Sequence, residues 1–162
     1  MIKSYLFCFS ILLISVLIET AVLSNLLFLP AIPDLLLICI LYFSVNKGSL
    51  FGEVSGFVSG VFIDFLSGSP FGLNCLYRTI IGYIAGFFKK MLNLKSVFVS
   101  ILIGFIGTVL KAVLIHLVSL FFPNYVNTYN LFSMLFLFEL IMNSILTPFI
   151  FKFLDCFEIA KN

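Results

Sequence analysis

The chain has 162 residues, of which 62% are hydrophobic and only 10% are charged, whereas a soluble domain carries about 25% charged residues. No soluble fold of this length has a core large enough to hide that much apolar surface from water, so the composition excludes a soluble globular domain and predicts an integral membrane protein with one domain. The net charge of +2 says little as a total, because the positions of the basic residues carry the information.

Six apolar segments are predicted to be membrane helices joined by short loops: 4–29, 34–45, 50–66, 71–88, 96–122 and 131–154. The second segment has only a dozen residues, fewer than the roughly 20 that a full crossing needs. Pro33 at a first helical position with Asp34 beside it is nevertheless typical of a helix start. The sequence therefore predicts an all-α integral membrane protein, a six-transmembrane-helix bundle whose second helix is short.

Glycines recur at every fourth residue before and along the third segment, at Gly48, Gly52, Gly56 and Gly60. Residues four apart lie on nearly one side of an α-helix, so these glycines form a strip without side chains. Each interior glycine costs roughly 0.8–1 kcal/mol relative to alanine in a helix in water, but in a bilayer a small-residue strip lets another helix approach closely. The strip is therefore predicted to be a helix-packing surface.

The fourth segment carries a second close-approach site, the pair Gly82 and Gly86. Between the third and fourth segments lies a turn rich in serine, glycine and proline, which we expect at the outer face of the membrane. Its candidate residues are Ser67, Gly68, Ser69, Pro70, Gly72 and Asn74.

Lysines in the short loops predict the orientation in the membrane. With six crossings, the N-terminus, the second and fourth loops and the C-terminal tail share one side, and the three opposite loops contain no basic residue. The basic residues on the shared side are Lys3, Lys47, Lys89, Lys90, Lys95, Lys152 and Lys161. Both termini are therefore predicted to be cytoplasmic. The loop between the fourth and fifth segments, which carries Lys89, Lys90 and Lys95, is expected to meet anionic lipid headgroups or a cytoplasmic partner.

Arg78 and Lys111 are basic residues inside the predicted helices, and the acidic residues Glu19, Asp64 and Glu139 lie inside their helices or near the outer ends. Such groups are costly in a membrane and usually face partners. Counted from the outer ends of their segments, Glu19, Lys111 and Glu139 lie ten, eleven and eight residues deep, which is nearly one depth at about 1.5 Å per residue. We expect a buried network in which Asp64 pairs with Arg78, and Lys111 pairs with Glu139 or Glu19. Three roles are open for it: fixing helix order, lining an ion or substrate path, or binding a partner.

The sequence contains no signal for catalysis. It has no nucleophile motif, no HExxH, no paired metal carboxylates and no phosphate-cradling loop. The four cysteines lie in separate apolar runs without CxxC spacing or a histidine at metal-ligand spacing. No catalytic residue, metal site, cofactor or nucleic-acid partner is predicted.

Three pieces of the sequence match a known family. They are Pro33-Asp34-Leu35-Leu36-Leu37; Gly56, Gly60 and Asp64 at four-residue spacing followed by the turn to Asn74; and Gly82-Tyr83 with Gly86. In these pieces, and in length and six-span layout, the chain resembles the MreD family of bacterial rod-shape-determining membrane proteins. That family is similar in fold to the substrate-binding subunits of energy-coupling-factor vitamin transporters.

The resemblance implies a non-catalytic subunit of the cell-elongation machinery in the bacterial inner membrane. It implies work with MreC, the actin-like MreB, the glycosyltransferase RodA and a class B penicillin-binding transpeptidase in peptidoglycan synthesis. Two hypotheses follow. In the first, the glycine strip and outer polar residues dock a partner's transmembrane helix, such as that of MreC, in a groove open to lipid. In the alternative, Asp64, Arg78 and Asn74 line a closed polar cavity for a vitamin-like ligand.

Overall fold

The computed structural model describes residues 2–25, 30–68, 70–94, 96–123, 126 and 133–157, and all regular structure in these ranges is helical. The main helices are α1 (Ile2–Leu17), α2 (Leu35–Lys47), α3 (Ser49–Leu66), α4 (Leu73–Phe87), α5 (Val97–Phe121) and α6 (Met134–Asp155). The predicted all-α bundle with a short second helix is confirmed over these residues. Four helical stretches are long and apolar enough to cross a membrane, namely Tyr5–Asn25, α3, α5 and α6.

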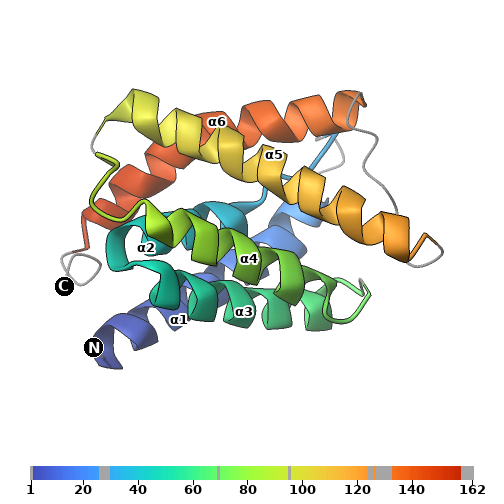
Figure 1. Ribbon diagram of the computed structural model, residues 1–162, viewed down its shortest axis with the longest axis horizontal. Coiled ribbons are helices and arrows are strands. Elements are labelled where there is room, and N and C mark those ends of the chain that lie inside the picture. Colours follow the sequence, from blue (N-terminus) through green and yellow to red (C-terminus); the bar gives the residue numbers. More distant parts are fainter. Residues whose placement is uncertain are drawn as a thin grey trace.

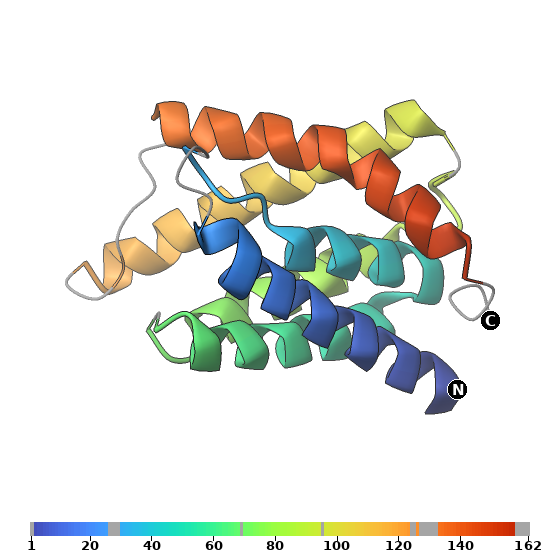
Figure 2. The same cartoon turned by 180° about the vertical axis from the view of Figure 1, so that it is seen from behind.

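The helices form two groups with α2 between them (Figure 1). Helices α5 and α6 cross on one side, and α3 and α4 run antiparallel on the other, with α1 crossing α3 and packing against both α3 and α2 (Figure 2). Every residue of α2 from 36 to 45 is buried. A helix that is apolar all round must be covered on every side, and this explains why the shortest main helix lies at the centre of the bundle.

Successive helices alternate in direction, so the turns gather at two opposite ends. The start of α1, the turn from α2 to α3, the connection from α4 to α5 and the end of α6 lie at one end, and the turn from α3 to α4 lies at the other (Figures 1 and 2). The lysine-bearing segments of the described residues are thus together, as the predicted six-span layout requires.

The first helix differs from the uniform span predicted for 4–29. After α1 the chain continues as a π-helix, η1 (Ile18–Val22), and then as a 3₁₀-helix, η2 (Leu23–Asn25). Thr20, Ser24 and Asn25 each donate a side-chain hydrogen bond to the carbonyl four residues earlier. Such side-chain bonds compete with the regular backbone ladder, which accounts for the change of winding around Glu19.

The glycine strip packs α3 against α4. A Cβ atom added at Gly52, Gly56 or Gly60 would overlap the backbone of α4, and one added at Gly82 or Gly86 would overlap the backbone of α3. The strip is therefore an internal packing seam of this chain. It is filled by α4, which leaves no space along the strip for the helix of another protein.

Gly48 has a different role from the other glycines of the strip. It lies in the turn between α2 and α3 with φ +103°, a left-handed conformation that side chains disfavour. Its backbone N–H donates to the carbonyl of Ser44 and closes the end of α2. Gly48 is thus required by the turn rather than by helix packing.

Candidate functional site: a buried charge cluster

The site begins at Asp34, the residue that starts α2. Its side chain is 2% exposed and accepts a 2.8 Å hydrogen bond from the backbone N–H of Leu37, which caps the helix. The backbone N–H of Asp34 donates to Oδ1 of Asn143 on α6 at 2.9 Å. Because α2 has only 13 residues, about 20 Å of length, its capped N-terminus lies inside the bundle.

Two basic side chains converge on this carboxylate. Nη2 of Arg78 on α4 lies 3.0 Å from the Asp34 oxygens, and Nζ of Lys111 on α5 lies 2.7 Å from Oδ2. Nζ of Lys111 also lies 2.7 Å from Oε1 of Glu139 on α6. We call Asp34, Arg78, Lys111 and Glu139 the charge cluster. Its formal charges, two positive and two negative, balance, as buried charges generally require.

The predicted pairing of Asp64 with Arg78 is wrong. Within the described residues the only side-chain hydrogen bonds of Arg78 go to Asp34, since its Nε and Nη1 have no hydrogen-bond partner there. Arg78 turns toward the centre of the bundle because Asp34 lies there rather than at the membrane surface. Asp34 is the first residue of the predicted segment 34–45, so the sequence alone gives no reason to include it in the buried network.

Asp64 instead caps α4. Its carboxylate accepts hydrogen bonds from the backbone N–H groups of Gly72, Asn74 and Cys75 at 2.9, 3.2 and 3.3 Å. It also accepts from Nδ2 of Asn74 at 2.7 Å, and Oδ1 of Asn74 accepts from the Tyr77 hydroxyl. These N–H groups belong to the first turn of α4, where a carboxylate is favoured.

The outer turn lets Asp64 reach these groups. Gly68 and Gly72 have φ values of +65° and +93°, and the backbone N–H of Leu73 donates to the carbonyl of Pro70. Ser67 ends α3 with its N–H bonded to Ile63. Ser69, also predicted for this turn, lies outside the described residues.

Of the two partners considered for Lys111, Glu139 forms an ion pair with it at 2.7 Å, whereas Glu19 accepts a 3.4 Å hydrogen bond from the backbone N–H of Leu36. Glu19 thus contacts the first turn of α2 from η1. One further hydrogen bond extends the cluster across α5 and α6, from Nδ2 of Asn143 to the hydroxyl of Thr108 at 3.1 Å.

The charge cluster connects the start of α2 to α4, α5 and α6. It leaves little room for a ligand. The hollow next to Lys111 and Glu139, between α5 and α6, is too tight for a water molecule. Across the described ranges no three side chains of His, Cys, Asp or Glu lie together in a way that suits a metal ion. The geometry suits a role in fixing the relative positions of helices far apart in the sequence.

Comparison with known proteins finds a family model that matches most of this chain. Residues 1–157 match the family model of the rod shape-determining protein MreD. No curated protein and no solved structure matches the chain.

Proposed function

Because the chain belongs to the MreD family of rod shape-determining membrane proteins, we propose that it is a non-catalytic membrane subunit of the bacterial cell-elongation complex. In this proposal it lies in the inner membrane with both termini in the cytoplasm and docks the transmembrane helix of MreC. MreB, RodA and a class B penicillin-binding transpeptidase are its further partners in a larger complex that directs peptidoglycan synthesis.

The observation that carries this proposal is the closed charge cluster. Lys111 bridges Asp34 and Glu139 at 2.7 Å on each side and Arg78 pairs with Asp34, so the charges at the centre neutralise one another. A scaffold that presents a fixed surface needs internal contacts of this kind, which hold its helices in fixed relative positions. A substrate-binding subunit of a vitamin transporter needs polar groups that face an open cavity, and no observation on the cluster favours that alternative.

The docking surface is proposed to be part of the lipid-facing side of the bundle, because α4 fills the glycine strip. Each long helix presents large apolar side chains outward, and one exposed residue represents each: Ile14 on α1, Phe57 on α3, Leu117 on α5 and Ile145 on α6. In a membrane these positions contact either lipid or another protein, and packing with a partner helix is driven by close fit.

Photocrosslinking tests the proposal directly. A photoreactive amino acid is placed at Ile14, Phe57, Leu117 or Ile145, one at a time, in cells that also make tagged MreC. We expect crosslinks to MreC from one or two neighbouring helices and none from the others, and rounded cells when the protein is depleted. Rod-shaped growth after depletion, or no crosslink from any face, would contradict the proposal. Retention of a vitamin by the purified protein would support the alternative instead.

A further inference from the structure

An apolar groove runs between α4 and α5 and has α2 as its floor. We call it the α4–α5 groove; it has a volume of about 280 Å³. Representative lining residues are Leu41 and Val45 of α2, Ile81 and Ala85 of α4, and Leu102 and Ile106 of α5. The groove is partly open, since lining residues such as Leu102 and Ile106 are exposed, and its wall is almost wholly hydrocarbon. In a membrane protein such a groove faces acyl chains.

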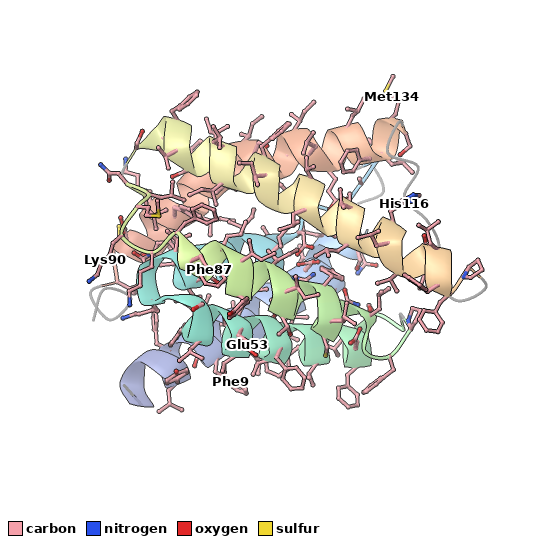
Figure 3. The ribbon with its side chains drawn as sticks, in the orientation of Figure 1. Phe9, Glu53, Phe87, Lys90, His116 and Met134 are labelled. Carbon is pink, nitrogen blue, oxygen red and sulfur yellow. The ribbon has the colours of Figure 1, made fainter. Side chains whose placement is uncertain are left out.

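The groove ends at a group of lysines. Phe88 and Leu92 line the groove, and between them the α4–α5 connection carries Lys89 and Lys90, both exposed. Nζ of Lys89 donates to the backbone carbonyl of Lys47 at 2.6 Å, which brings the end of α2 to the same place. Figure 3 labels Lys90 at this end of the molecule, next to the end of α4.

Lys90 has an unusual backbone conformation for its type. Its φ is +68°, in the left-handed region, and it is the only described residue other than glycine with a positive φ. Such a conformation is uncommon for a residue with a side chain. The connection therefore holds a lysine where the backbone alone would favour glycine.

We propose that the α4–α5 groove binds one acyl chain of an anionic phospholipid, whose phosphate lies against Lys89 and Lys90. The charge complementarity carries the choice of occupant. An anionic phospholipid places a phosphate directly beyond its apolar chain, in the same order as the groove and its lysines. The proposed cytoplasmic orientation of this end adds to the match, because anionic lipids of that leaflet attract basic segments.

Lipid retention measured by native mass spectrometry tests the headgroup contact. The delipidated full-length protein is titrated with phosphatidylglycerol and, separately, with phosphatidylcholine. We expect tighter binding of phosphatidylglycerol, and loss of about fivefold in its affinity for each lysine removed in Lys89→Ala and Lys90→Ala. Lys152→Ala is the matched control, because Lys152 is an exposed lysine in the last turn of α6, at the same end but away from the groove. Equal affinity of all variants would overturn the proposal.

A second pair of variants tests the acyl-chain contact. Ile106→Trp fills the groove, whereas Val113→Trp places the same bulk on an exposed part of α5 that does not line it. We expect Ile106→Trp to lower the retention of both lipids severalfold and Val113→Trp to leave it unchanged. Unchanged retention in Ile106→Trp would overturn the proposal. So would a dimer that Ile106→Trp disrupts, because a second copy of the chain would then occupy the groove.

Discussion

Oδ2 of Asp34 lies 2.7 Å from Nζ of Lys111, although 77 positions separate the two residues in the chain. The contact joins the start of α2 to the middle of α5, and Glu139 brings α6 to the same ammonium group. A buried ion pair of this kind adds little stability compared with apolar packing, but removal of one member leaves an uncompensated charge and is costly.

Substitutions at Lys111 and Glu139 are therefore expected to be strongly coupled. Lys111→Met leaves an excess negative charge in the core and Glu139→Gln an excess positive one, so each should destabilise the protein by about 3–5 kcal/mol. The double variant restores the balance and should be more stable than Lys111→Met alone. Thermal unfolding of the purified protein in detergent measures all four members of this cycle.

The charge-reversed pair provides a stricter check. Lys111→Glu and Glu139→Lys should each prevent assembly of the helix bundle. The double variant with both charges swapped should recover part of that assembly. If the losses of stability in the single variants simply add up in the double variant, in both cycles, the 2.7 Å contact does not couple the two residues.

Asp64 is expected to stabilise α4 through its cap. Asp64→Ala removes the acceptor for the N–H groups of Gly72, Asn74 and Cys75 and should cost about 1–2 kcal/mol, as does the loss of other helix caps. Asp64→Asn keeps an acceptor oxygen and should cost less. The melting temperature in detergent measures the difference.

The matched control for Asp64 is Glu53→Ala, which removes a partly exposed carboxyl group from the same helix and should change stability little. If Glu53→Ala loses as much stability as Asp64→Ala, the cause is the removal of a negative charge from α3 rather than the loss of the helix cap.

The contrast between Asp34 and Asp64 explains how far the sequence predicts this molecule. Apolar runs, turn residues and lysine positions were sufficient for the helices, their order and the short second helix. Depth along a helix was sufficient to bring Lys111 and Glu139 to one level, because α5 ends and α6 begins at the same end of the bundle.

The position of Asp34 did not follow from the same reasoning. The predicted segment 34–45 begins at Asp34, which would put this residue at the membrane surface, whereas a helix of 13 residues is about 10 Å shorter than the roughly 30 Å hydrocarbon layer. Since the other end of α2 lies with the lysine-bearing turns at one end of the bundle, the missing length has to fall at Asp34, inside the bundle. The shortness of the second segment was thus an available signal for the partner of Arg78.

The glycine strip is expected to respond to the smallest enlargement. Gly56→Ala places a Cβ closer than 3.0 Å to the backbone of α4, and backbone atoms cannot move aside as a flexible side chain does. Overpacking of this kind costs about 1–3 kcal/mol or more, and Gly56→Leu should prevent folding. The yield of monodisperse protein after purification measures the loss.

Val54→Leu is the control for the strip, since Val54 is exposed on the same helix and tolerates an added methylene in lipid. The amount of MreC recovered per folded molecule should be equal for Gly56→Ala and the wild type. A specific loss of MreC from well-folded Gly56→Ala would return the docking surface to the α3–α4 seam.

The predicted orientation in the membrane determines which cysteine variants a membrane-impermeant reagent can reach from outside. In a background without native cysteines, Lys90→Cys should react with a membrane-impermeant maleimide only after the inner membrane is permeabilised, because the lysine-bearing end is expected to be cytoplasmic. Phe71→Cys, at an exposed position of the turn between α3 and α4, should react in intact spheroplasts. Lys152→Cys should behave like Lys90→Cys, since both lie at the same end of the bundle. Labelling of Lys90→Cys from outside would reverse the orientation, and labelling of Phe71→Cys and Lys90→Cys from one side would mean that α4 does not cross.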